Sequence, residues 1–133
     1  MPGEPFADLV AIMARLRAPD GCPWDREQTL KDLARYIVEE AGEVARAVES
    51  GDMEAVEEEL GDLLFNLIHA ARIAEEGGHF DISRVVEGAK EKIVRRHPHV
   101  FGDAEAKTTE EVLAHWNRVK AEEKARRKRP DPG

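Results

Sequence analysis

Four carboxylates are placed symmetrically about one glycine in the first half of this chain. Glu40 and Glu43 precede Gly51 by eleven and eight residues, and Glu59 and Asp62 follow it by eight and eleven. If two helices meet in a turn at Gly51, both pairs lie roughly 12 Å from that turn, at about 1.5 Å rise per residue. Each pair has i, i+3 spacing, so its two side chains project from one helix face.

Four converging carboxylates repel one another unless a cation lies between them. Their hard oxygen atoms suit Mg²⁺, with Mn²⁺ as a substitute. The pattern therefore predicts a divalent metal site and, with it, phosphate chemistry. A solvated acidic helix face is the alternative, because from Glu39 to Asp62 ten acidic residues stand against one basic residue.

The residues after Gly51 argue against a merely solvated face. Between Leu60 and Ile68, apolar side chains occupy most sides of the expected helix. Polar groups nevertheless recur there at helical spacing, at Glu59, Asp62, Asn66 and His69. Burying such a stripe is costly unless its groups are satisfied. A helix this apolar is typical of a central or shared element, so we expect a homo-oligomer, either a dimer or a tetramer.

The elements that position these residues are expected to be helical. The 133 residues suffice for one domain, and the low aromatic content with apolar positions at helical spacing favours an all-α fold. We expect a bundle of about five helices, in which an antiparallel helix hairpin carries the acidic metal site and oligomerisation completes the bundle. The helices are expected near 5–17, 30–49, 52–76, 81–96 and from 109 onward. Residues 1–125 would form the domain, and 126–133 a basic, proline-containing flexible tail.

Composition limits the class of protein and its partners. No apolar run of 18 residues and no signal-peptide pattern appears, so we expect neither membrane insertion nor secretion. The single cysteine, Cys22, fits a reducing cytoplasm. The stretch from Arg118 to Arg129 is basic, but the net charge is −8, which argues against a nucleic-acid partner.

A second cluster of charge follows the acidic one. Lys92, Arg95 and Arg96 have spacings of three and four residues, and such a fork of cations can grip the β- and γ-phosphates of a nucleotide. The alternative is a solvated basic helix end that interacts with the helix dipole. Trp116 and Trp24 can each stack on a base, or serve as core or lid residues.

The acidic residues form the motif E-E-x-x-E, then fifteen residues, then E-x-x-D. The flanking stretches 21–29, 58–65 and 95–101 read GCPWDREQT, EELGDLLF and RRHPHVF, and Trp116 is followed four residues later by Lys120. With these motifs the chain resembles the MazG family of all-α nucleoside triphosphate pyrophosphohydrolases, over roughly residues 5–123. It resembles a single copy of the N-terminal type of domain, whereas many members carry two in tandem.

The resemblance implies an enzyme that hydrolyses nucleoside triphosphates to the monophosphate and pyrophosphate with Mg²⁺, as broad-specificity house-cleaning of the nucleotide pool. It implies that Glu40, Glu43, Glu59 and Asp62 are metal ligands, that Glu39 has a catalytic, water-activating role, and that Lys92, Arg96 and Trp116 bind substrate. Two alternatives stay open. One is a narrow pyrophosphohydrolase for pyrimidine deoxynucleotides or phosphoribosyl-ATP. The other is a non-catalytic helical dimerisation or regulatory module.

Overall fold

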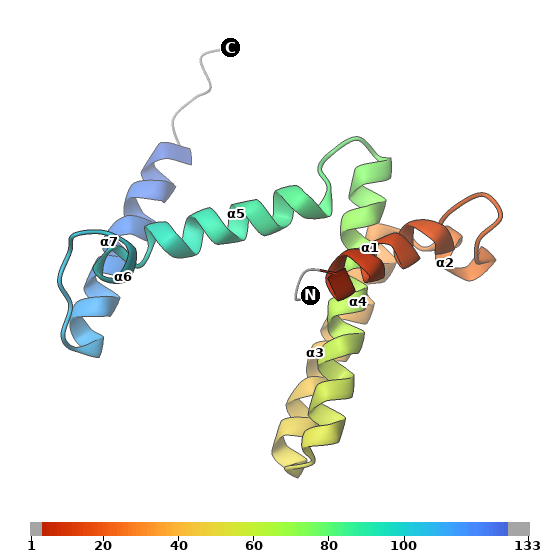
Figure 1. Ribbon diagram of the computed structural model, residues 1–133, viewed down its shortest axis with the longest axis horizontal. Coiled ribbons are helices and arrows are strands. Elements are labelled where there is room, and N and C mark those ends of the chain that lie inside the picture. The colour runs from red at the N-terminus through yellow and green to blue at the C-terminus, as the bar shows by residue number, and fades with distance from the viewer. Residues whose placement is uncertain (1–3, 128–133) are drawn as a thin grey trace. The chain divides into compact units, whose positions relative to one another are not determined.

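A computed structural model describes residues 4–127, which form helices joined by turns and loops and contain no strand (Figure 1). Within that range the helices are α1 (Glu4–Leu16), α2 (Pro23–Glu27), α3 (Leu30–Ser50), α4 (Met53–Glu76), α5 (Ile82–Arg95), α6 (Pro98–Phe101) and α7 (Thr109–Arg127). The all-α prediction is confirmed, and the five predicted helices correspond to α1, α3, α4, α5 and α7. In the described part of the chain, no helix has the length and apolar character needed to span a membrane.

Two short helices, α2 and α6, were not predicted. Each begins with a proline, Pro23 or Pro98, at its first position. Proline is favoured there because its fixed φ suits the helix and its missing N–H would have no intrahelical partner. At the other end of the chain, α7 continues to Arg127, two residues into the segment expected to be a tail. Residues 128–133 lie outside the described range.

The chain divides into two compact units, Met1–Ser83 and Arg84–Gly133. The first contains α1 to α4. The second contains most of α5, together with α6 and α7, up to Arg127 where the description ends. The acidic motif therefore lies in the first unit, and the cluster of Lys92, Arg95 and Arg96 lies in the second.

The first unit is organised by the hairpin of α3 and α4, which pack side by side (Figure 1). Thr29 and Asp32 form a capping box at the start of α3. Gly51 ends α3 with a φ of 77°, and its N–H donates to the Val48 carbonyl. Asp52 then caps α4 by accepting from the backbone N–H groups of the next turn. These local signals fix where the chain reverses, and hence which residues of the two arms face each other.

The apolar core of this unit is small. Helix α1, which contributes buried Met13, packs against α4, which contributes buried Ile68, while α3 contributes buried Leu33. Buried alanines on α3 and α4 have little side-chain bulk, so helices can approach closely at Ala47, Ala71 and Ala74. The packing holds α3 and α4 in a fixed register at the level of the acidic residues.

The left-handed conformation of Gly51 gives a test of the hairpin. No atom lies within 4 Å of a Cβ built at Gly51, so the only cost of Gly51→Ala is backbone strain. We expect a loss of roughly 1 kcal/mol in the free energy of unfolding, measured by urea denaturation. Gly61→Ala is the matched control, because Gly61 is helical and also has open space around it. It should instead stabilise by roughly 0.5–1 kcal/mol. A stabilising Gly51→Ala would contradict this account of the turn.

Candidate active site

Three of the four predicted metal ligands converge across the hairpin. Glu40 on α3 and Glu59 and Asp62 on α4 each offer one carboxylate oxygen, and these oxygens all lie within 4.8 Å of one another. Glu43 is outside this group. Its Oε1 accepts a hydrogen bond of 2.7 Å from Arg46 Nη2, one turn further along α3. The symmetry about Gly51 thus brings the two arms together, while one of the four carboxylates is held by a neighbouring cation.

The electrostatics of Glu40 fit a cation site. A hydrogen bond with Glu59, partial burial, and the negative charges of Glu59, Asp62 and Glu43 raise the pKa of Glu40 to about 7. The Oε2 atom of Glu40 is buried and has no hydrogen-bond partner. A buried carboxylate oxygen without a donor is costly, and a divalent cation would satisfy it. Hard carboxylate oxygens are also the ligands that Mg²⁺ and Mn²⁺ prefer, so the donor set fits either ion.

A pocket of about 470 Å³ opens beside these carboxylates. Its acidic wall includes Glu39, which the sequence assigned to water activation. Its aromatic wall is formed by Trp24 and Tyr36, whose ring centroids lie 5.8 Å apart at an interplanar angle of 33°. The complete lining is Trp24, Tyr36, Glu39, Glu40, Glu43, Glu59 and Asn66. A pocket with one aromatic wall and one charged wall suits a ligand that has an apolar part and a charged part.

Tyr36 is the wall residue that the sequence analysis missed. It lies one turn before Glu40 on the same helix, so i, i+4 spacing could have indicated it. Asn66, which belongs to the polar stripe of α4, donates from Nδ2 to the Tyr36 carbonyl at 3.5 Å. This contact joins the two helices behind the pocket.

His69, the last member of the polar stripe, does not belong to the carboxylate group. It is buried, and its Nε2 lies 3.3 Å from the Asp25 carbonyl and 3.2 Å from Nη1 of Arg17. Burial lowers the pKa of His69, with the charge of Arg17 acting in the same direction. Arg17 also forms a 2.8 Å ion pair with Glu76 and donates to the carbonyls of Asp25 and Gln28. The network attaches the α2 segment, and with it Trp24, to α4.

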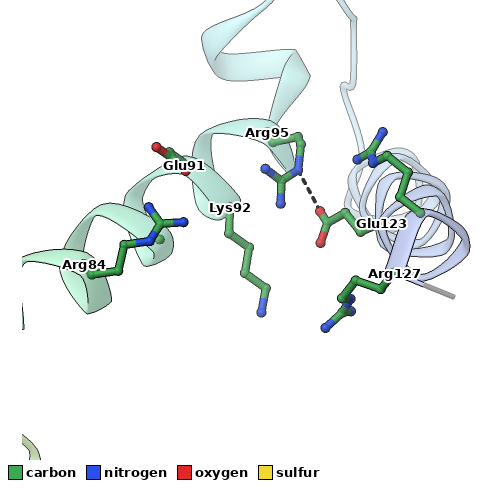
Figure 2. Close-up of a pocket in the computed structure, with 8 residues that line it drawn as sticks. Arg84, Glu91, Lys92, Arg95, Glu123 and Arg127 are labelled. Carbon is green, nitrogen blue, oxygen red and sulfur yellow. Dashed lines mark hydrogen bonds and ion pairs between the residues drawn. The ribbon is translucent and has the colours of Figure 1, made fainter. Parts of the chain in front are cut away.

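The second unit contains the other predicted residues, which the structure divides into two groups. Arg96 is 6% exposed; its Nη2 donates to Oε1 of Glu123 at 2.9 Å and its guanidinium lies over the Trp116 ring, 5.0 Å from the centroid. Lys92 and Arg95 instead line a separate pocket of about 450 Å³ between α5 and α7. Arg95 Nε also donates to Glu123, at 2.9 Å (Figure 2).

Glu123 is the residue of this unit that the sequence did not single out. It accepts from both Arg96 and Arg95, and these hydrogen bonds lower its pKa to about 2. In the sequence Glu123 is one of four glutamates in α7, and no spacing distinguishes it from the others.

The raised pKa of Glu40 predicts how stability depends on pH. The folded protein holds this proton more tightly than the unfolded chain, whose pKa is about 4.5. The stability that Glu40 contributes is therefore present below about pH 4.5 and is lost as the pH rises through about 7. The test is the difference in Tm between the wild type and Glu40→Gln, measured in EDTA. This difference, wild type minus variant, should fall as the pH rises from about 4.5 to about 7. A difference that stays flat or rises would contradict the assignment.

A divalent cation held by the ionised carboxylates would reverse this loss, because its binding would stabilise the folded protein. We expect Mg²⁺ to raise Tm more at pH 8 than at pH 5 in the wild type, and to have little effect at either pH in Glu40→Gln. Differential scanning calorimetry with and without Mg²⁺ measures both.

Comparison with known proteins agrees with this arrangement. A family model described as the MazG nucleotide pyrophosphohydrolase domain matches residues 28–101, which include the whole hairpin. The crystal structure of a mazG-related protein from Thermotoga maritima superposes with a TM-score of 0.74 at 29% sequence identity, covering 86% of this chain and 98% of that one.

Curated relatives are closer in sequence. The nucleoside triphosphate pyrophosphohydrolase of Escherichia coli (strain K12) is 46% identical over 120 residues, which cover 90% of this chain and 46% of that protein. The nucleoside triphosphate pyrophosphohydrolase/pyrophosphatase MazG of Thermotoga maritima is 42% identical over 123 residues, covering 92% and 47%. The chain thus spans about half the length of the curated relatives it matches. With more than half of its residues matched by the family model and the acidic hairpin in place, the chain belongs to the MazG nucleotide pyrophosphohydrolase domain family.

Proposed function

We propose that this protein is a Mg²⁺-dependent enzyme that hydrolyses nucleoside triphosphates to the monophosphate and pyrophosphate, with broad specificity for the base. The observation that carries the proposal is the convergence of Glu40, Glu59 and Asp62, together with the unpartnered buried oxygen of Glu40. The names of the relatives from Escherichia coli and Thermotoga maritima supply the substrate class.

In this proposal Glu40, Glu59 and Asp62 hold the cation, and Glu43 joins them by leaving its exposed ion pair with Arg46. That pair offers little resistance, because exposed ion pairs contribute about 0–1 kcal/mol. When bound, the cation supplies positive charge that stabilises phosphate oxygens and promotes ionisation of water.

Glu39, on the wall of the pocket, accepts the proton of the attacking water. The water oxygen forms a bond to the α-phosphorus, the bond from that phosphorus to the α–β bridging oxygen breaks, and pyrophosphate leaves with the electron pair. Broad specificity is consistent with the pocket's two aromatic rings, because every base presents a π face to a ring.

We assign phosphate and base contacts in the second unit to Lys92, Arg95, Arg96 and Trp116. Lys92→Ala and Arg95→Ala should each lower kcat/KM about 10-fold or more, by a similar factor for every base, because all triphosphates share the same tail. Trp116→Ala should have effects that differ between purine and pyrimidine substrates if its ring stacks on the base. The measurement is kcat/KM for each variant against several triphosphates. Base-dependent losses at Lys92 would refute its role at the phosphates.

We further propose that the protein is a cytoplasmic homo-oligomer, a dimer or a tetramer. The support is the apolar surface of the hairpin, where Val38 is 72% exposed and Leu60 is 50% exposed. Exposed apolar area of this kind usually marks an interface. Nucleoside triphosphates are made and used in the cytoplasm, which is the reason for placing the enzyme there. Sedimentation at micromolar concentration should give more than 14.9 kDa, the mass of one chain.

The direct test of the activity is release of pyrophosphate from a panel of nucleoside triphosphates with Mg²⁺. We expect turnover with several purine and pyrimidine substrates, and comparable turnover when Mn²⁺ replaces Mg²⁺. Turnover with one pyrimidine deoxynucleotide or with phosphoribosyl-ATP alone would replace broad specificity by a narrow one. No turnover with any substrate would leave a binding or regulatory module.

A further inference from the structure

The pocket between α5 and α7 is lined mainly by cations. It has a volume of about 450 Å³ and lies entirely within residues 84–127 (Figure 2). Lys92 and Arg127 extend from the two helices toward the same opening (Figure 2). The full lining is Arg84, Gly88, Glu91, Lys92, Arg95, Glu123, Arg126 and Arg127. Five cationic side chains therefore surround this space, against two carboxylates.

One of these two carboxylates is already engaged. Glu123 is buried and accepts hydrogen bonds from Arg95 and from Arg96, which is not part of the lining. Its negative charge is thus divided between two guanidinium groups. Among residues 4–127, Lys92, Arg126 and Arg127 form no ion pair. Cations held close together repel one another, and an anion of high charge would relieve that repulsion.

The pocket is distinct from the contact between Arg96 and Trp116. Neither of those residues lines it, and Arg96 faces the Trp116 ring. The pocket therefore offers cations without an aromatic surface, so it suits an anion rather than a base. Four of its five cations are arginines, whose planar forks match phosphate oxygens in pairs.

We propose that Arg84, Arg126 and Arg127, together with Lys92 and Arg95, form a binding site for a polyphosphate group. Free pyrophosphate and the triphosphate tail of a nucleotide are two sources of this chemistry. The proposal adds three arginines to Lys92 and Arg95, which were assigned to phosphate contacts above. Arg84 lies near the start of α5, and Arg126 and Arg127 lie in the last turn of α7. Binding of the free anion does not depend on the proposed hydrolysis.

The test is a calorimetric titration, in which pyrophosphate is added to the full chain in the presence of EDTA and its binding affinity is measured. The double variant Arg126→Ala/Arg127→Ala should weaken pyrophosphate binding by at least about 10-fold, since two charge-assisted contacts are lost. The matched control is Arg118→Ala with Lys124→Ala, which removes the same charge from exposed positions of α7 outside the pocket. It should change affinity by about 2-fold or less. Arg84→Ala should weaken binding from the α5 side.

The proposal would be overturned if the Arg126→Ala/Arg127→Ala double variant bound pyrophosphate as tightly as the wild type. It would also be overturned if this double variant and the control double variant weakened binding equally. Thermal unfolding of all variants shows whether an effect comes from loss of structure. Turnover then identifies the source. If KM for every triphosphate rises in the Arg126→Ala/Arg127→Ala double variant, the triphosphate tail of the nucleotide occupies the pocket. If KM is unchanged but inhibition by added pyrophosphate weakens, the occupant is free pyrophosphate. If the enzyme shows no turnover, the titration in EDTA still decides whether the pocket binds.

Discussion

Replacing Glu40, Glu59 or Asp62 with alanine should lower kcat at least ~100-fold with every triphosphate, because a metal site that loses one ligand loses occupancy and geometry. The oxygens of these three residues converge within 4.8 Å, so each variant removes one side of the same small cluster. Glu43→Ala should have a similar effect, since Glu43 is proposed to complete the set. Steady-state kinetics at saturating Mg²⁺ measures the loss.

Thermal stability distinguishes loss of the metal site from loss of the folded structure. Removing one of several repelling carboxylates should leave Tm in EDTA unchanged or raise it. Glu58→Ala is the matched control, because Glu58 is exposed, precedes Glu59 on α4 and is not among the pocket's lining residues. It should retain normal turnover. Near-normal kcat in all four variants would mean that these carboxylates do not hold a catalytic cation.

The second large effect is expected at Glu123. Glu123→Ala leaves the buried guanidinium of Arg96 without its carboxylate, and Arg95 loses its partner as well. Removing one member of a buried ion pair is strongly destabilising, because the remaining charge has no compensation. We expect amide protection in α5 and α7 to collapse while α3 and α4 keep theirs, as measured by hydrogen exchange. Glu122→Ala, at the exposed neighbouring position, should leave both regions protected.

The low pKa of Glu123 gives an independent check. Its folded pKa of about 2 lies below the value of about 4.5 expected for the unfolded chain. The stability it contributes is therefore complete above about pH 4.5 and is lost as the pH falls toward about 2. Protection of α5 and α7 should fall over that range in the wild type, and the fall should be absent in Glu123→Ala. Unchanged protection in Glu123→Ala at neutral pH would show that the pair does not stabilise this unit.

The sequence was a good guide where the controlling interactions are local. The turn at Gly51 and the caps at Thr29 and Asp52 depend on neighbouring residues, so helix ends and the meeting of the two acidic arms could be predicted. Glycine at a left-handed position and a side-chain oxygen at a helix start each have a single physical explanation.

It was a poor guide where the partner is distant along the chain. The pairing of Arg96 with Glu123 spans 27 residues, and no spacing rule selects one glutamate from that helix. His69 shares a helical stripe with Glu59 and Asp62, yet it turns toward Arg17 and Asp25 because the stripe winds past the edge of the carboxylate group. Periodicity indicates which face a residue occupies, but tertiary packing decides what that face meets.

The most direct measurement of the central claim is turnover of a nucleoside triphosphate in ¹⁸O-labelled water with Mg²⁺, with the products followed by phosphorus NMR and mass spectrometry. The account predicts one ¹⁸O atom in the nucleoside monophosphate, unlabelled pyrophosphate, and no turnover when EDTA replaces Mg²⁺ or when Glu59 is replaced by alanine. Release of labelled orthophosphate with a nucleoside diphosphate, or turnover that persists in EDTA, would contradict it.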